Sequence, residues 1–407
     1  MTTPSVVQPN LDYEEIWVSV DSLPWCALVT TGRAGSDFFQ SLLDGHPELF
    51  VFNGPLFFHE FWSASPCASY PGGPQLDDLI AEFIGNHIAK FKSHYDATER
   101  KAALGENQDQ SLDIDLDELR HHIAQMMMLK PLTSRTFLSA VYVSYTLCLR
   151  QDVFAKKVFF HHIHHIIKLD PFLVDFPEAR IISMTRDPRA LYVSGVEHWR
   201  KFDPGSDQAG HALYVLKRTI CDAQPLKAYT NEFRALKLED LGNKDVLEAV
   251  CVWMGIAYDP CLEHSTWGGL RWWGDKLSQT SIPKNESGFS PTIVKNNWSK
   301  KLPTLDKALL AFLLEDRLSW YGYEQPRRYG PLFMIMALFL IPWPTIYERY
   351  FFSVSYLMWQ LRARQFRLIG SNILCYLRRV TLFYGLFGKR ISGQRFDLPF
   401  FRPSQAS

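Results

Sequence analysis

The sequence lacks a cysteine framework and a secretion signal. Its seven cysteines are an odd number, and no two of them form a Cys-x-x-Cys pair, so neither a disulfide scaffold nor a zinc ribbon is indicated. The first 24 residues contain four carboxylates and no apolar run. We therefore expect no signal peptide there and a chain that works in the cytoplasm.

The chain also lacks a net charge, but its two parts differ in charge. Residues 327–407 contain 12 basic and 2 acidic residues, and the preceding part has a net charge of −10. Residues 329–347 and 350–361 are uncharged, but Pro342 and Pro344 interrupt the first of these runs, so a straight membrane-spanning helix is not expected.

A basic, apolar tail favours contact with an anionic membrane surface on its cytoplasmic side. In this interpretation the tail lies in the interface as a re-entrant or interfacial hairpin. Five arginines would then face the headgroups: Arg362, Arg364, Arg367, Arg378 and Arg379. Packing of the tail onto the acidic body, or a homodimer interface, are the alternatives.

Short apolar stretches alternate with longer helical patterns before this tail. The predicted strands are 25–30, 49–52, 158–162, 181–185 and 235–238. The predicted helices are 36–43, 76–92, 116–129, 135–150, 189–200, 209–233, 246–254 and 305–320. This alternation predicts a three-layer α/β domain with a mostly parallel sheet over residues 1–326. An α-helical, hydrophobic extension would follow over residues 327–407.

A glycine-punctuated turn follows the first predicted strand. Residues 31–39 read Thr-Gly-Arg-Ala-Gly-Ser-Asp-Phe-Phe and lead into a helix. Glycines allow the backbone to approach a ligand closely, and a helix start presents free N–H groups, so this turn suits a phosphate or sulfate. It is not a Walker A motif, because the Gly-Lys-Ser/Thr that serves Mg²⁺-dependent phosphoryl transfer is missing.

A second candidate anion site follows the strand at 181–185. Asp187 and Pro188 are typical of a helix start, so Arg186 would lie at the carboxyl end of the strand, where α/β sheets bind ligands. Ser194 follows on the same helix, and the two side chains could bind one phosphate together. The alternative is a structural ion pair between Arg186 and Asp187.

Together these segments resemble the nucleotide motifs of sulfotransferases that use 3′-phosphoadenosine 5′-phosphosulfate (PAPS), of the carbohydrate-type and bacterial kind. The resemblance covers about residues 25–324 and omits the tail. It implies a P-loop-like fold and a PAPS site that releases 3′,5′-adenosine bisphosphate. Arg186 and Ser194 would bind the 3′-phosphate. The residues that would hold the 5′-phosphosulfate are Arg33, Ala34, Gly35, Ser36, Asp37 and Phe38.

The sequence departs from that family at two places. Asp37 stands where a Ser or Thr is frequent, which weakens anion binding unless its carboxylate turns into the first turn of the helix. Residues 161–165, His-His-Ile-His-His, replace a Lys-Thr-Pro-like segment. These histidines do not all share one face of a strand or a helix, so no metal site is predicted, and the family's reaction needs no metal.

The implied reaction transfers a sulfuryl group to a hydroxyl or amine of a small-molecule, lipid or carbohydrate acceptor. Arg33 would stabilise charge on the departing phosphate oxygen. Glu60 occupies the region where carbohydrate-type relatives place a catalytic glutamate, and His59 and then His162 are the next candidates for the base. A kinase-like phosphotransferase and a catalytically silent membrane scaffold are the competing interpretations, and no nucleic-acid partner is indicated.

Overall fold

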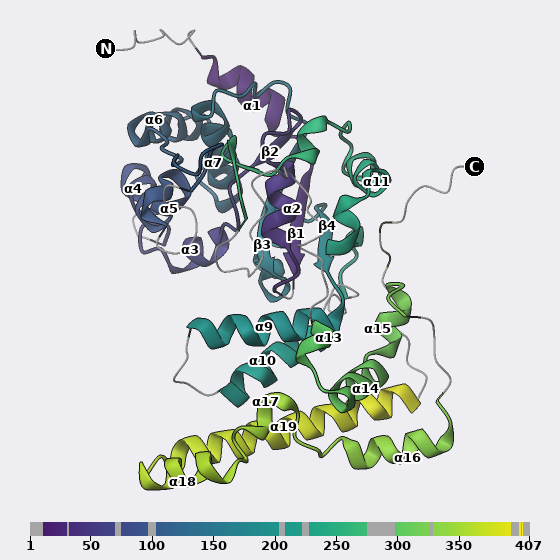
Figure 1. Ribbon diagram of the computed structural model, residues 1–407. Coiled ribbons are helices and arrows are strands. Elements are labelled where there is room, and N and C mark those ends of the chain that lie inside the picture. Colours follow the sequence, from purple (N-terminus) through teal and green to yellow (C-terminus); the bar gives the residue numbers. More distant parts are fainter. Residues whose placement is uncertain are drawn as a thin grey trace, which may run out of the picture.

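The computed structural model describes residues 11–30, 32–69, 75–96, 103–202, 208–221, 228–274, 298–324, 329–391, 399 and 401. Five strands form one parallel sheet in the order β2-β3-β1-β4-β5 (Figure 1). Their bounds are β1 Trp25–Thr30, β2 Leu49–Val51, β3 Val158–His165, β4 Arg180–Thr185 and β5 Phe233–Lys237. The predicted α/β fold with a parallel sheet is thus confirmed.

Helices before, between and after the strands complete the body. Those of the first half are α1 Tyr13–Val20, α2 Ser36–Leu43, α3 Phe58–Ala64, α4 Leu76–Asn86, α5 Ile88–Phe91, α6 Leu116–Met127, α7 Ser134–Cys148 and α8 Leu169–Asp175. Those of the second half are α9 Pro188–Phe202, α10 Gln208–Cys221, α11 Lys244–Met254, α13 Trp298–Lys301, α14 Thr304–Leu313 and α15 Glu315–Trp320. Short 3-10 helices connect some of them, and the small antiparallel pair of β6 (Thr266–Trp267) and β7 (Leu270–Arg271) follows α11.

Successive residues of β3 show which helices cover which face of the sheet. His161 is buried, and its Nδ1 lies 2.9 Å from the Tyr142 hydroxyl of α7. His162 is also buried, but its Nδ1 lies 2.7 Å from Oε1 of Gln40 on α2. Because side chains alternate along a strand, α7 and α2 lie on opposite faces, which gives the three layers.

One predicted helix extends too far. The predicted helix 209–233 corresponds to α10, which ends at Cys221, and Phe233 is the first residue of β5. Pro225 in this segment cannot continue a helix, because its ring removes an N–H donor and clashes with the preceding turn. This signal was present in the sequence and should have ended the predicted helix earlier.

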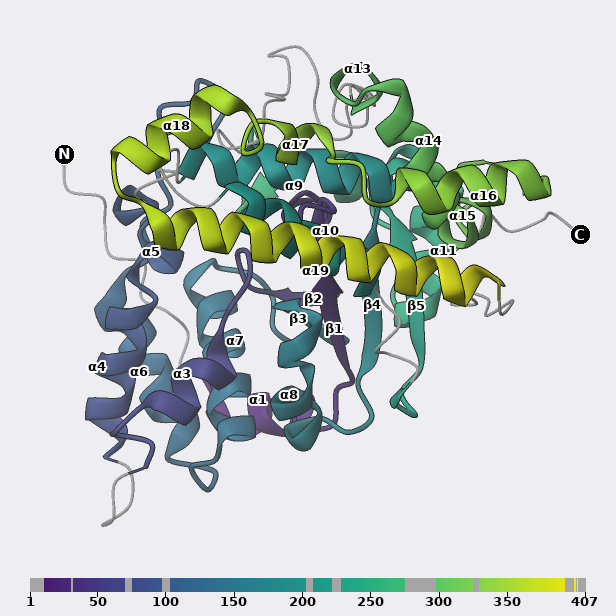
Figure 2. The same cartoon turned by 90° about the horizontal axis from the view of Figure 1, so that it is seen from below.

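The C-terminal region is helical, as expected, and packs against the body. Its helices are α16 Pro331–Leu340, α17 Ile346–Arg349, α18 Val354–Arg362 and α19 Phe366–Ile391. Figure 1 shows them below α9 and α10, on the side away from the sheet, and Figure 2 shows α19 crossing in front of α10. A second buried apolar cluster joins the two parts, with Val193 of α9, Leu216 of α10 and Phe312 of α14 packed with Ile341 and Phe383 of the tail. Apolar packing therefore continues from the body into the tail. The domain boundary at residue 326 stays a prediction.

Arg379 does not face outward, contrary to the expectation from the sequence. Its side chain is buried, and its Nε and Nη2 donate to the two carboxylate oxygens of Glu348 at 3.0 and 2.8 Å. Nη2 also donates to the Trp343 carbonyl oxygen. A buried arginine needs such partners, because an unpaired charge in a protein interior is costly. Arg379 thus fixes the turn between α16 and α17 onto α19.

Within the described ranges, no helix combines the length and the apolar character needed to cross a bilayer.

The chain end returns to the sheet. The Ala235 N–H of β5 donates to the Pro399 carbonyl oxygen at 2.8 Å, and the Phe401 N–H donates to the Ala235 carbonyl oxygen at 3.0 Å. The buried Phe401 ring packs edge-on against Trp253 of α11, with ring centroids 5.4 Å apart. Pro399 and Phe401 therefore pair with the outer strand β5.

Candidate functional site

The turn after β1 has the backbone geometry of an anion-binding loop. Gly32, Arg33 and Gly35 have φ angles of 100°, 54° and 83°, in the left-handed region. Gly35 is the N-cap of α2, and no side chain caps that helix start. The first N–H groups of α2 and its positive dipole end therefore favour an anion at this loop. Thr31 lies outside the described residues.

Arg186 brings the second predicted motif against this loop. It directly follows β4, and its Nη1 donates to the Arg33 carbonyl oxygen at 3.3 Å. Burial lowers the pKa of the Arg186 guanidinium, and the carboxylate of Glu239 partly opposes that effect. Its Nε is buried and has no hydrogen-bond partner among the described residues. A buried cation with an unused donor is the group that a phosphate would complete.

Asp187 pairs directly with Arg189, although its charge also acts on Arg186. Its carboxylate accepts from Arg189, with Oδ1 3.0 Å from Nε and Oδ2 2.8 Å from Nη2. The Asp187 N–H donates to Glu239, which also accepts from the Tyr323 hydroxyl at 2.7 Å. The alternative of an ion pair between Arg186 and Asp187 is thus wrong, because Arg189 takes that partner.

Ser194 lies on the same helix, α9, and is half-buried. The loop residues Ala34 and Ser36 are buried, whereas Asp37 is half-buried. The Asp37 carboxylate lies beside β3, with its Oδ1 3.7 Å from Nδ1 of His162. The structure therefore directs this unusual carboxylate toward the histidine segment.

Three side chains of this region could hold a metal ion. Ligand atoms of Asp37, His162 and His164 all lie within 4.8 Å of one another. Burial lowers the pKa of both imidazoles, against the opposing effect of the Asp37 carboxylate, so they are neutral near pH 7. Nδ1 of His164 lies 3.3 Å from Nε2 of His162. The ring nitrogens of His162 already have Gln40 and His164 as partners. The absence of a metal from the proposed site stays a prediction.

Arg218 of α10 is a cation that the sequence analysis missed. Its guanidinium lies over the loop: the position that a Cβ of residue 32 would occupy is 3.3 Å from Nη2 of Arg218. Its Nη2 donates to Nδ1 of His165 at 2.6 Å, and Nη1 donates to the Tyr214 hydroxyl at 2.7 Å. Burial lowers the pKa of His165 to about 4, which keeps this imidazole an acceptor. No spacing in the sequence links residue 218 to residue 32.

Glu60 lies near the carboxyl end of β3. Its Oε1 is 3.5 Å from Nζ of Lys168, which ends the 3-10 turn Ile166–Lys168 after β3, and the Glu60 side chain is partly exposed. Phe57, one turn earlier, stacks on the His165 ring with centroids 6.3 Å apart. Glu60 therefore lies near the end of β3 that also carries His165, the partner of Arg218.

His59 and His162 have closer structural partners. His59 Nε2 lies 3.0 Å from Oδ2 of Asp175, and its ring packs against Phe172 and His161. His162 is fully buried, and both ring nitrogens have partners, Gln40 and His164. Their proposed role as a base stays a prediction, and the exposure of Glu60 makes it the better candidate.

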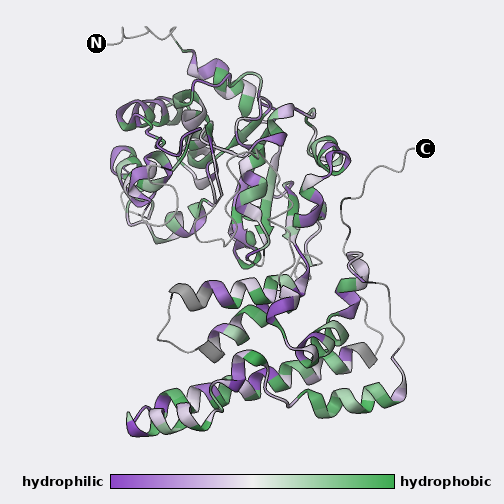
Figure 3. Ribbon diagram, in the orientation of Figure 1, coloured by the Kyte–Doolittle hydropathy of each residue, from purple (hydrophilic) through white to green (hydrophobic). Residues whose placement is uncertain are grey.

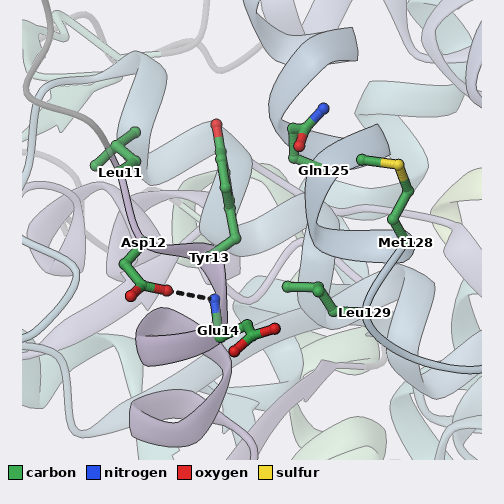
Figure 4. Close-up of a pocket in the computed structure, with 7 residues that line it drawn as sticks. All are labelled: Leu11, Asp12, Tyr13, Glu14, Gln125, Met128 and Leu129. Atoms are coloured by element: carbon green, nitrogen blue, oxygen red, sulfur yellow. Dashed lines mark hydrogen bonds between the residues drawn. The ribbon is translucent and has the colours of Figure 1, made fainter.

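A shallow pocket lies far from these residues. It is lined by Leu11, Asp12, Tyr13, Glu14, Gln125, Met128 and Leu129, at the start of α1 and the end of α6 (Figure 4). Its Asp12 carboxylate caps α1 by accepting from the Glu14 N–H at 3.0 Å. Figure 1 shows α1 and α6 at one end of the molecule and the C-terminal helices at the other, with α9 and α10 between them. We assign no part of the chemistry to it.

The Gly35→Ala variant is expected to lose about 2–4 kcal/mol of unfolding free energy, from left-handed strain and overpacking. A Cβ at Gly35 would lie 2.5 Å from Cδ1 of the buried Leu238, at a φ of 83°. Gly269→Ala is the matched control, because its φ is 77° and nothing lies within 4 Å of its Cβ position. It should lose only about 1 kcal/mol. Equal losses in urea denaturation would contradict the close packing of Gly35 on Leu238.

Comparisons with known proteins give structural matches only. No family model matches the sequence, and no curated protein matches it. The sulfotransferase domain of the Synechococcus PCC 7002 olefin synthase is 17% identical, with 72% of this chain and 95% of that chain covered and a TM-score of 0.38. The sulfotransferase domain from the curacin biosynthetic pathway is 14% identical, with 76% and 94% covered and a TM-score of 0.35. Sulfotransferase STF1 from Mycobacterium tuberculosis H37Rv is 15% identical, with 71% and 81% covered and a TM-score of 0.29. These three matches cover between 71% and 76% of the chain.

Proposed function

We propose that this protein is a PAPS-dependent sulfotransferase that acts on a hydroxyl or amine of an acceptor. The observation that carries the proposal is the contact between Arg186 and the Arg33 carbonyl oxygen, 153 residues apart in sequence. It joins the two segments that resemble the 5′-phosphosulfate and 3′-phosphate motifs. A nucleotide with phosphates at both positions would find a cationic or N–H donor for each.

The residues fit such a nucleotide chemically. The buried Nε of Arg186 lacks a partner among the described residues, and a 3′-phosphate oxygen would supply one. Ser194 on α9 would add a hydroxyl donor to the same phosphate. The uncapped start of α2 would bind the 5′-phosphosulfate. When bound, PAPS supplies the sulfuryl group, whose bond to the bridging phosphate oxygen breaks as a bond to the acceptor atom forms.

The chain's own residues would then have distinct tasks. Arg33 and the first N–H groups of α2 would stabilise the negative charge on the departing phosphate oxygen. Glu60 would accept the proton from the acceptor, and Lys168 would hold the carboxylate toward the sheet edge. Preorganised donors suffice for such charge stabilisation.

Calorimetry with two nucleotides tests the proposal. We expect 3′,5′-adenosine bisphosphate to bind much more tightly than 5′-AMP in the presence of a chelator, because only the former has the 3′-phosphate that Arg186 would bind. Equal affinities would contradict the assignment, and binding that requires Mg²⁺ would favour a kinase-like enzyme. Incubation with labelled PAPS and with lipid and polar extracts would then identify the acceptor. A chain that binds the bisphosphate but labels nothing would support the scaffold interpretation.

A further inference from the structure

The C-terminal helices carry an unusually apolar outer surface. Of the 27 large apolar side chains that are exposed in the described part of the chain, 17 lie between residues 332 and 384. We call these 17 the apolar platform. Its most exposed members include Leu332 and Phe339 on α16, Val354 and Trp359 on α18, and Phe366 and Leu377 on α19. Figure 3 shows α16 as almost continuously hydrophobic. Exposed apolar side chains that gather on a few helices indicate an interaction site.

Other side chains of α16, α17 and α19 already pack on the body. Ala337, Tyr347 and Phe387 are buried in the cluster that joins the tail to α9, α10 and α14. The platform therefore remains after the tail has packed on the body, and Figure 2 shows its helices outermost in the molecule. The tail has already docked on its own body, so the platform is not exposed merely because the tail is undocked.

The charges around the platform select its partner. Arg362, Arg364, Arg367 and Arg378 are exposed on or between α18 and α19. Glu348 is the sole carboxylate in residues 329–391, and it is buried against Arg379. The exposed charges of this surface are therefore basic. A symmetric dimer would bring the same basic patch into both sides of its interface, whereas anionic lipid headgroups supply the opposite charge.

The platform also has the side chains of a bilayer interface. Trp343, Tyr350 and Trp359 are exposed beside purely aliphatic neighbours such as Leu338 and Leu361. Tryptophan and tyrosine prefer the headgroup level, where the ring is apolar and its polar atom is hydrated. We infer that α16, α18 and α19 dock the protein onto an anionic lipid surface, with the apolar platform in the acyl boundary and the four arginines at the headgroups.

Docking would also orient the candidate site. α10 contacts the loop after β1 through Arg218 and packs on the tail through Leu216. One helix therefore separates the loop region from the membrane-binding helices. An acceptor alcohol anchored in the same bilayer would be on the near side of the enzyme. This orientation rests on the proposed function, whereas the docking itself does not.

Vesicle flotation of the full chain tests the inference. We expect the protein to float with phosphatidylcholine vesicles that contain phosphatidylserine, more weakly with phosphatidylcholine alone, and more weakly at high salt. The double variant Arg364→Gln with Arg367→Gln should reduce partitioning about 10- to 30-fold, since each nearby charge contributes about 1 kcal/mol. Arg120→Gln, an exposed arginine of α6, should leave it unchanged.

A second pair of variants tests the apolar contribution. Val354→Ser should weaken flotation, whereas Val174→Ser on α8 should not, although the two valines are 77% and 82% exposed. A folded chain, verified by circular dichroism, that does not float with anionic vesicles overturns the inference. So does a stable dimer in lipid-free buffer that Val354→Ser dissociates, since a second copy would then cover the platform. Nucleotide calorimetry on the same samples separates a failure of docking from a failure of the proposed function.

Discussion

The Arg186→Ala variant is expected to bind 3′,5′-adenosine bisphosphate about 10- to 150-fold more weakly than the unchanged chain, while its affinity for 5′-AMP stays the same. A hydrogen bond to a charged group contributes roughly 1.5–3 kcal/mol, and tenfold corresponds to about 1.4 kcal/mol. The Arg186 guanidinium is buried beside the Arg33 carbonyl oxygen and has an unused Nε–H. Isothermal titration calorimetry with both nucleotides measures the difference.

Arg180→Ala serves as its control. Arg180 is at the other end of the same strand, β4, and its Nη1 donates to the Trp253 carbonyl oxygen at 2.8 Å. Its removal should leave the affinity for the bisphosphate unchanged. If both variants lost affinity equally, the loss would reflect a weakened β4 and not a missing phosphate contact.

The Glu60→Gln variant is expected to turn over about 10²- to 10⁴-fold more slowly, the usual range for the loss of a general base, with nucleotide affinity unchanged. The amide keeps the size of the carboxylate but cannot accept the acceptor's proton. Single-turnover rates with labelled PAPS, together with calorimetry, separate the transfer step from binding.

Lys168→Gln distinguishes catalysis from a structural ion pair. Lys168 lies 3.5 Å from Glu60, and both side chains are partly exposed, so the pair itself contributes little to stability. If Glu60 only pairs with Lys168, the two variants should behave alike and keep normal turnover. That result would move the base to His59 or His162, whose buried contacts make them weaker candidates.

Local patterns predicted the centre of the fold well. The strand at 25–30 and the helix at 36–43 were predicted with the bounds that the structure has. Apolar runs bounded by glycine, and a helix start after glycine, are strong local signals. The short helices α3 and α8 were missed, because seven residues are too few to show a clear helical period against a background of aromatic side chains.

In the candidate site, too, residues in local motifs were predicted and contacts between distant segments were not. Arg33 and Arg186 were predicted because each follows a strand in a motif of its own, and their contact confirms that the two motifs meet. The contacts of Arg218 with the loop, and of Asp37 with His162, join residues more than 100 positions apart. They depend on how α10 and β3 pack in three dimensions, and no pattern within either segment encodes that packing.

The pairing of the chain's last residues with β5 has a consequence for solubility. An outer strand of a sheet presents unpaired N–H and C=O groups that can recruit a strand from another molecule. At Ala235 both groups are taken by Pro399 and Phe401 of the same chain. Pro399 and Phe401 thus protect a sheet edge against association between copies. We therefore expect removal of Pro399 and Phe401 to increase association between copies at high protein concentration.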